Sequence, residues 1–267
     1  VAATMLGQSK TVTQADGDIP FGLIEHFKYN AHFLTKIYSE QPVSTPGCWN
    51  RMEYRPLEGF VFALTPFNFT MIAGNLPAAP AMVGNTIVWK TAAEQIYSAQ
   101  VLMEVFKEAG VPDGVINFVH VSGPVAGDVI FKHPDFGGIH YTGSTKTLHL
   151  MYKTIGENIQ NYKTFPRIVG ETGGKDFIIM HPSADPREVA TALTRASFEY
   201  QGQKCSASSR AYIPASQWEA VKECMLDDQK RITVGSPEDF SNYLAAVISR
   251  ESFDKIKGYL DNAKESD

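Results

Sequence analysis

The sequence has few cysteines, and none of them lies in a pairing or chelating pattern. Three cysteines are present among 267 residues, Cys48, Cys205 and Cys224, and three cannot form a closed disulfide framework. There is no C-x-x-C and no His-x-x-x-His spacing, so we expect no metal site and interpret the seven histidines as ordinary surface or core residues. This cysteine usage indicates a reducing compartment.

The sequence also lacks both common phosphate-binding glycine motifs. Neither G-x-G-x-x-G nor G-x-x-x-x-G-K-[ST] occurs, so the usual dinucleotide fingerprint and the P-loop are absent. No apolar run approaches the roughly 18 residues of a membrane span. The most apolar stretch, Ile72–Trp89, is interrupted by prolines and asparagines. We therefore expect no membrane span.

Positive charge is in the minority. The 24 lysines and arginines against 29 acidic residues give a net charge of −5, which disfavours a nucleic-acid partner. Hydrophobic residues make up 43% and charged residues 20%, which is typical of a chain that buries a sizeable core. A disordered chain or a polyanion-binding protein is therefore not expected.

Hydrophobic periodicity predicts that strands and helices alternate along most of the chain. Such alternation with short turns is typical of a parallel sheet with helices on both faces, so the predicted fold class is α/β. A short strand at Arg51–Arg55 is expected before this pattern begins. The strands are expected at 59–64, 86–90, 115–119 and 138–141, and the helices at 71–83, 96–108, 124–132 and 145–162.

Two glycine-containing segments are expected to open helices. Gly143 and Ser144 follow a predicted strand, and the free N–H groups of a helix start can bind an anion. Ser144 is equally suited to be a plain N-cap. Gly123 and Gly127 open another predicted helix, which by itself indicates little.

Cys205 is the cysteine best placed to be reactive. It lies in the small polar loop Gly202–Ser206, where Lys204 and backbone N–H groups favour the thiolate, which is the nucleophilic form. The alternative is a small buried apolar residue. That alternative also suits Cys224 and Cys48.

Two further polar residues are candidates for chemistry. Glu171 lies in a glycine-rich break between predicted strands, where it is either a general base or an acid that caps a turn. Asn68 lies between two phenylalanines directly after a predicted strand. Its side-chain N–H₂ is either an oxyanion donor or a cap of the next helix.

The joint order of these features is more specific than any of them alone. An Asn after a strand, a Lys that ends a buried strand, a Gly-Ser helix start, a Glu in E-x-G-G-K and a Cys in G-Q-x-C-S occur in this order between residues 68 and 205. This set resembles the NAD(P)-dependent aldehyde dehydrogenase superfamily. Segments 7–12, 66–69, 164–167 and 202–207 are most similar to the branch that oxidises glutamate γ-semialdehyde, the open hydrated form of Δ1-pyrroline-5-carboxylate, to glutamate in proline catabolism.

The resemblance implies a catalytic set. Cys205 would attack the aldehyde to form a thiohemiacetal, with Asn68 and the Cys205 backbone N–H stabilising the oxyanion. Hydride transfer would leave a thioester, and Glu171 would activate the water that hydrolyses it. No step requires a metal.

The same resemblance implies binding residues for a nicotinamide cofactor and for a short aldehyde that carries a carboxylate. NAD is the expected cofactor, and NADP is not excluded because Ala93 stands where the family often has a Glu near the ribose. The implied cofactor residues are Lys90, Gly123, Gly127, Gly143 and Ser144, and the implied substrate residues are Phe69, Lys204 and Ser206.

Two domains are implied: a Rossmann-like cofactor domain at 1–174, with a lead-in over 1–58, and the first part of an α/β thiol domain at 175–267. We expect a fragment that is inactive alone, and a homo-oligomeric enzyme with a functional link to proline dehydrogenase. Its expected place is the cytoplasm in a bacterium or the mitochondrial matrix in a eukaryote, with no targeting segment in this stretch. The alternatives are another NAD(P)-dependent aldehyde dehydrogenase or a nucleotide-binding module without turnover.

Overall fold

The computed structural model describes residues 1–265. The chain divides into two compact units, which we describe separately. The first unit is Gly17–Glu171, and the second combines Val1–Asp16 with the chain from Thr172 onward. The sequence had suggested that residues 1–58 lead into the cofactor domain, whereas the structure groups the first sixteen with the later part of the chain.

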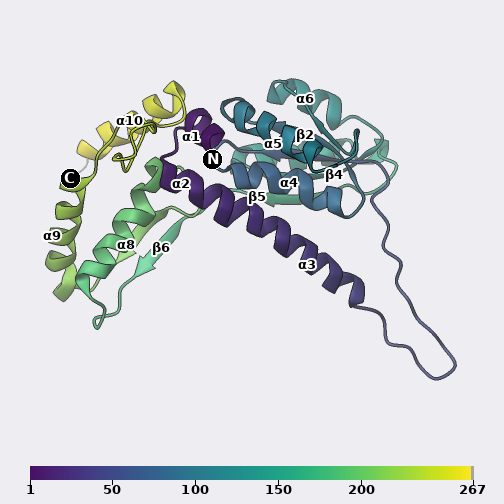
Figure 1. Ribbon diagram of the computed structural model, residues 1–267, viewed down its shortest axis with the longest axis horizontal. Coiled ribbons are helices and arrows are strands. Elements are labelled where there is room, and N and C mark those ends of the chain that lie inside the picture. Colours follow the sequence, from purple (N-terminus) through teal and green to yellow (C-terminus); the bar gives the residue numbers. More distant parts are fainter. Residues whose placement is uncertain (266–267) are drawn as a thin grey trace. The chain divides into compact units, whose positions relative to one another are not determined.

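The first unit is built on a five-stranded sheet with the order β3-β2-β1-β4-β5. Every neighbouring pair in this sheet is parallel, which confirms the predicted α/β class (Figure 1). The strands are β1 (Phe60–Thr65), β2 (Thr86–Thr91), β3 (Ile116–Phe118), β4 (Phe136–Thr142) and β5 (Arg167–Glu171).

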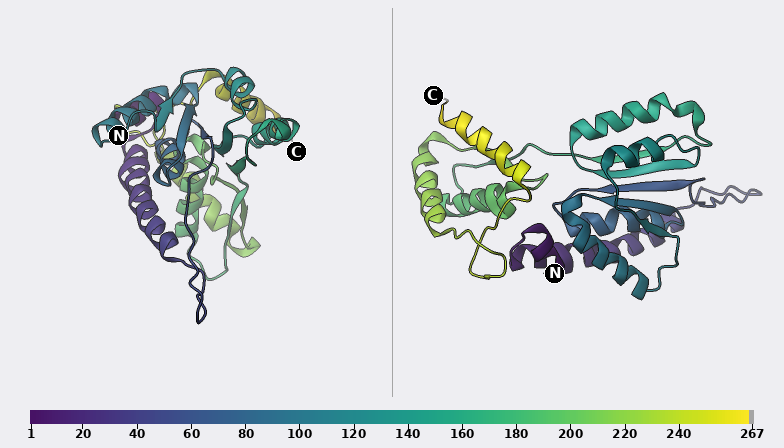
Figure 2. Two further views of the ribbon diagram at one scale, coloured as in Figure 1. Left: turned by 90° about the vertical axis from the view of Figure 1, so that its right-hand side faces the viewer. Right: turned by 90° about the horizontal axis from the view of Figure 1, so that it is seen from above.

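Helices cover both faces of this sheet (Figure 2). Alternate side chains of β1 explain why both faces are apolar: Val61 and Ala63 pack into one core cluster, and Phe62 packs into the other. The crossover helices are α4 (Thr70–Met82) and α5 (Ile96–Glu108) on the first face, and α6 (Gly123–Ile130) and α7 (Thr145–Glu157) on the second.

The lead-in to the first unit is helical and then extended. The helical elements are α2 (Val12–Asp18), η1 (Ile19–Ile24) and α3 (Glu25–Ser39). The strand expected at Arg51–Arg55 was predicted wrongly, because these residues are exposed and pair with no other strand. Its apolar side chains, Met52 and Tyr54, stay 47% and 42% exposed, and Arg51 forms an ion pair with Glu53 at 2.8 Å. This stretch belongs to an extended segment after α3 that projects from the sheet (Figure 1).

The second unit begins with α1 (Ala2–Gln8) and contains a two-stranded parallel sheet with helices packed on it. Its core cluster consists of Met180, Ala190, Leu193 and Val221. The elements are β6 (Asp176–Ile179), α8 (Pro186–Phe198), η4 (Glu199–Gly202), β7 (Ser208–Tyr212), α9 (Ala215–Arg231) and α10 (Arg250–Lys264). Within residues 1–265, no helix is long and apolar enough to cross a membrane.

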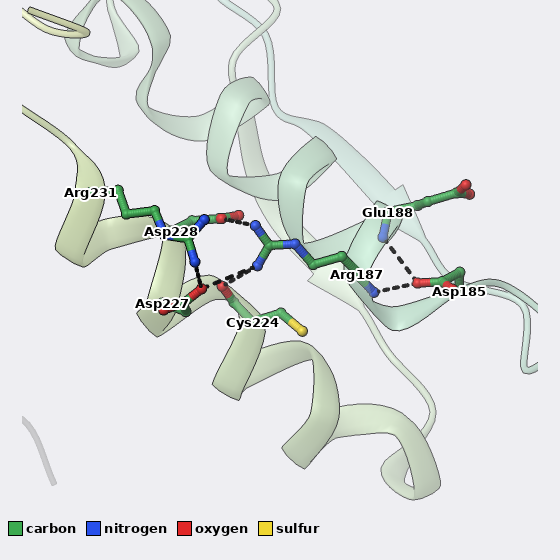
Figure 3. Close-up of polar contacts among 7 residues, drawn as sticks. All are labelled: Asp185, Arg187, Glu188, Cys224, Asp227, Asp228 and Arg231. Carbon is green, nitrogen blue, oxygen red and sulfur yellow. Dashed lines mark hydrogen bonds and ion pairs between the residues drawn. The ribbon is translucent and has the colours of Figure 1, made fainter.

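Polar contacts join α8 to α9 (Figure 3). The carboxylate of Asp185 accepts the N–H of Arg187 at 2.7 Å and so caps α8. The Arg187 guanidinium reaches the carbonyl of Cys224 at 3.3 Å and forms an ion pair with Asp228. Cys224 is therefore part of a structural contact between two helices.

Candidate functional site

In the first unit, the carboxyl edge of the sheet gathers most of the residues proposed from the sequence. Asn68 follows β1, Lys90 is the last residue but one of β2, and Gly143 and Ser144 follow β4. Glu171 is the last residue of β5. The strand order reverses between β1 and β4, and ligands of open α/β sheets bind at such a point.

The turn between β4 and α7 is tightly built. The Gly143 N–H donates to the carbonyl of Glu171 at 3.1 Å, which joins this turn to the end of β5. A Cβ atom added to Gly143 would lie 2.3 Å from the Tyr141 hydroxyl oxygen, so only glycine fits there without a shift. That hydroxyl donates to the Ser144 carbonyl at 3.0 Å, and burial raises the pKa of Tyr141.

Ser144 caps α7. Its hydroxyl oxygen accepts the Thr147 N–H at 3.2 Å, as expected for an N-cap. The cap interpretation of Ser144 is therefore confirmed. Its contact with an anion or a cofactor stays a prediction.

Lys90 keeps a half-buried ammonium group near the same edge. Its Nζ donates to the carbonyl of Thr91 at 2.9 Å. Burial lowers the pKa of Lys90, and the nearby carboxylate of Glu94 opposes this shift. The two glycines of α6 are less constrained. An added Cβ would meet nothing within 4 Å at Gly123 and only the Phe131 ring, at 3.5 Å, at Gly127.

The loop after β1 places Asn68 and Phe69 before α4. The helix begins with its Thr70 and Met71 N–H groups bound to Asp18, at 2.9 Å and 2.8 Å. Asp18 thus supplies the cap that the sequence had offered as an alternative role for Asn68. The ring of Phe69 is half-buried against the core cluster of the first face.

Glu171 ends the first unit with an exposed side chain. Its backbone holds the β4–α7 turn, through the Gly143 N–H described above and the register pair Thr142–Glu171. An exposed carboxylate at a sheet edge is accessible to water, as a general base for hydrolysis must be.

The proposed nucleophile lies in the second unit, after a left-handed turn. Tyr200, Gln201 and Gly202 have φ angles of 53°, 57° and 68°, and Cys205 follows three residues later. Cys205 is partly buried. A Cβ added to Gly174 would lie 2.4 Å from the Cys205 carbonyl oxygen. The second glycine of the E-x-G-G-K pattern is thus required by close approach to the cysteine's own peptide.

Lys204 already has an anionic partner. Its Nζ lies 2.7 Å from a carboxylate oxygen of Glu199, and the two side chains are only 20% and 23% exposed. Glu199 also binds Arg195 at 3.1 Å. Burial acts to raise the pKa of Glu199, but the hydrogen bonds and charges of Lys204 and Arg195 outweigh it and hold that pKa below its usual value.

The sequence interpretation missed Glu199. Its position five residues before Lys204 matches no helical or strand spacing, and the left-handed turn between them brings the two together. Ser206, the residue that directly follows Cys205 in the sequence, is exposed. Among the described residues, no group of three or more His, Cys, Asp or Glu side chains is placed to hold a metal ion.

The sequence profile of the aldehyde dehydrogenase family matches residues 1–267. The chain belongs to this family.

Its relatives are more specific than the family. The chain is 45% identical, over 98% of its length, to a probable delta-1-pyrroline-5-carboxylate dehydrogenase of Schizosaccharomyces pombe. It is 43% identical over 100% of its length to the human mitochondrial delta-1-pyrroline-5-carboxylate dehydrogenase. It covers 49% and 47% of these two proteins, so the chain spans about half the length of the curated relatives it matches.

A solved structure is similar over the same range. The Mycobacterium tuberculosis delta-pyrroline-5-carboxylate dehydrogenase, determined with NAD bound, superposes with a TM-score of 0.96 at 48% identity. The match covers 99% of this chain and 50% of that one.

Proposed function

We propose that a full-length enzyme containing this chain oxidises glutamate γ-semialdehyde to glutamate with NAD. The observation that carries this proposal is the similarity of the whole chain to proteins named as delta-1-pyrroline-5-carboxylate dehydrogenases, at 43% to 48% identity. The partly buried Cys205, in a loop tied to Gly174 and Glu199, supports a thiol-based mechanism.

The chain's own residues have the following roles in this proposal. The Cys205 thiolate attacks the aldehyde carbon, and the carbonyl oxygen becomes an oxyanion that accepts N–H bonds from Asn68 and from the Cys205 backbone. NAD, when bound, accepts the hydride that leaves this carbon. Glu171 then takes a proton from the water that attacks the resulting thioester, and the Cys205 thiolate leaves.

The carboxyl edge of the first unit suits a dinucleotide. It offers the start of α7 and the ammonium group of Lys90, and a parallel sheet reverses its strand order there. The negative charge of Glu94 beside Lys90 disfavours a further phosphate on the ribose, so we propose NAD rather than NADP. The residues proposed to hold it are Lys90, Gly123, Gly127, Gly143 and Ser144.

For the substrate, Phe69 would contact the aliphatic chain, and Ser206 and Lys204 would meet the carboxylate. Because Lys204 is bound to Glu199, it can reach a substrate carboxylate only by sharing or releasing that contact. Ser206 is exposed and has no such restriction on its hydroxyl.

We also propose a functional partner, an oligomeric state and a cellular location for this enzyme. Its substrate is the product of proline oxidation, so a functional link to proline dehydrogenase follows from the chemistry. Val43 and Trp49 are 83% and 77% exposed on the segment after α3, which supports a homo-oligomer that covers them. The enzyme would lie in the mitochondrial matrix in a eukaryote and in the cytoplasm in a bacterium.

Replacing the nucleophile tests the proposal. In the full-length enzyme, Cys205→Ser should lower NADH formation from Δ1-pyrroline-5-carboxylate by several orders of magnitude, because a serine hydroxyl ionises far less than a thiol. Calorimetric NAD binding should stay within about twofold of the wild-type affinity. The matched control is Cys224→Ser, at the cysteine whose carbonyl binds Arg187, and it should keep normal turnover. Turnover of Cys205→Ser above about a tenth of wild type would contradict the assignment.

A further inference from the structure

The turn that precedes Cys205 is held in an unfavourable conformation. Tyr200 and Gln201 have φ angles of 53° and 57°, in the left-handed region that residues other than glycine seldom occupy. A bulky side chain persists there only when its surroundings hold it in place. The contacts of Tyr200 therefore bear on where Cys205 lies.

Tyr200 is anchored by the N-terminal segment of the same unit. Its side chain is fully buried, and its hydroxyl donates to the carbonyl of Gln8 at 2.8 Å, across 192 positions of sequence. The Lys10 ammonium group lies 4.7 Å from the centre of the Tyr200 ring. Lys10 is only 1% exposed, and a desolvated ammonium group on a ring face is a strong form of the cation–π contact. Gln8 and Lys10 thus fix both the hydroxyl and the ring face of Tyr200.

Gln203 links Tyr200 to Cys205. The Tyr200 carbonyl accepts the Gln203 backbone N–H at 3.0 Å and its side-chain N–H₂ at 3.3 Å. The other end of that amide accepts the Ile248 N–H at 2.9 Å. Gln203 is therefore held at the backbone and at both ends of its amide, two residues before Cys205.

The far side of Cys205 leaves it little room to adjust. The backbone at Gly174 lies so close to the Cys205 carbonyl that no side chain fits between them. Lys204 is bound to Glu199, at the other end of the left-handed turn. A change in the Tyr200 peptide would therefore shift the cysteine relative to the groups around it.

We propose that Tyr200, held by Gln8 and Lys10, is a positioning residue that sets the location and reactivity of the Cys205 thiol. The inference rests on the proposed function, in which Cys205 is the nucleophile. In this proposal, Gln8 and Lys10 act on the thiol indirectly. They hold the hydroxyl and the ring face of Tyr200, and Tyr200 in turn holds the loop that carries Cys205.

The test is the rate at which iodoacetamide labels each cysteine, followed by mass spectrometry of the separate peptides over a range of pH. Tyr200→Phe removes the hydroxyl and keeps the ring, and Lys10→Met removes the ammonium group and keeps the apolar stem. In either variant, Cys205 should be labelled at least about threefold more slowly at neutral pH, because the loop that holds the thiol beside Lys204 and the neighbouring backbone N–H groups loses its anchor. The exposed Cys48 is the internal reference and should keep its rate.

The matched control is Tyr162→Phe. The Tyr162 hydroxyl donates to the carbonyl of Phe131 at 2.6 Å, so this variant makes the same chemical change in the first unit. Both tyrosine variants should lower the melting temperature, but Tyr162→Phe should leave Cys205 labelling unchanged. Unchanged Cys205 labelling in Tyr200→Phe, or equal slowing in Tyr162→Phe, would overturn the inference.

The same data separate this inference from the proposed function. The proposed function fails if wild-type Cys205 reacts no faster than Cys48 and the full-length enzyme does not oxidise the aldehyde. The positioning inference depends only on the ratio of variant to wild-type labelling rates at Cys205, which is measured whether or not turnover occurs.

Discussion

Glu199 is the residue that most changes the interpretation of the thiol loop. Lys204, next to the proposed nucleophile, looked like a cation available to a substrate carboxylate. Its ammonium group is instead 2.7 Å from Glu199, which also binds Arg195. The charge beside Cys205 therefore serves first to hold the loop.

This pair predicts a pH-dependent loss of stability in Glu199→Gln. The pKa of Glu199 is held below its ordinary value of 4.5 in the folded chain, so the unfolded chain binds more protons between the two values. The stabilisation is fully present above the ordinary value and is lost as pH falls through the lowered one. Urea unfolding should show a loss of about 1.5–3 kcal/mol at pH 7, typical of hydrogen bonds to charged groups, and this loss should shrink under acid conditions.

The control for this change is Glu223→Gln, at an exposed position of α9. It should alter the free energy of unfolding by less than about 0.5 kcal/mol at both pH values. An equal loss for Glu199→Gln at neutral and acid pH would show that the contact with Lys204 and Arg195 is not electrostatic in origin.

Among single residues, those with local signals were the predictable ones. Ser144 follows a strand and precedes a helix, and its cap to Thr147 is a contact between near neighbours. The partners of Tyr200 could not be predicted, because its hydroxyl binds Gln8 across 192 positions. The spacing of apolar residues along the chain does not indicate contacts between segments so far apart in sequence.

At the scale of elements, α4 shows how a distant residue supports a helix with poor local signals. The helix contains Pro77 and Pro80, and its N-cap residue Phe69 makes no side-chain cap bond. Its first N–H groups bind the buried carboxylate of Asp18, 52 positions earlier. The helix was predicted from its apolar residues, but its cap could not be.

Removal of this cap should destabilise the first unit. Asp18→Ala deletes the acceptor of the Thr70 and Met71 N–H groups, and should lower the free energy of unfolding by about 1–2 kcal/mol. Asp18→Asn keeps one acceptor and should lose less. Asp16→Ala, at an exposed position of the same helix, should have little effect in the same urea titration. Equal losses for Asp16→Ala and Asp18→Ala would contradict the capping role.

The strands were predictable to the extent that they are buried. The runs that became β1, β2 and β4 are apolar because helices cover both faces of the sheet, and their positions follow from that pattern. Arg51–Arg55 alternates polar and apolar residues, but its apolar side chains, Met52 and Tyr54, stay exposed, and it remains extended without a strand partner. Alternation without burial was the misleading signal.

At the scale of the whole molecule, the order of strands and helices indicated the α/β class. The sequence pattern could not show that the first sixteen residues belong to the same unit as the chain from Thr172 onward. That grouping depends on contacts such as Tyr200 with Gln8 and Gln14 with Tyr243, each between segments far apart in sequence.

The central claim is that the aldehyde carbon becomes bonded to the sulfur of Cys205. The most direct test is mass spectrometry of the full-length Glu171→Gln enzyme, quenched in acid shortly after mixing with Δ1-pyrroline-5-carboxylate and NAD. Loss of the general base should slow thioester hydrolysis by roughly 10²–10⁴-fold, so that the acyl adduct accumulates. We expect this adduct on the peptide that contains Cys205, with Cys48 and Cys224 unmodified. An unmodified Cys205 peptide, or an adduct on either other cysteine instead, would contradict it.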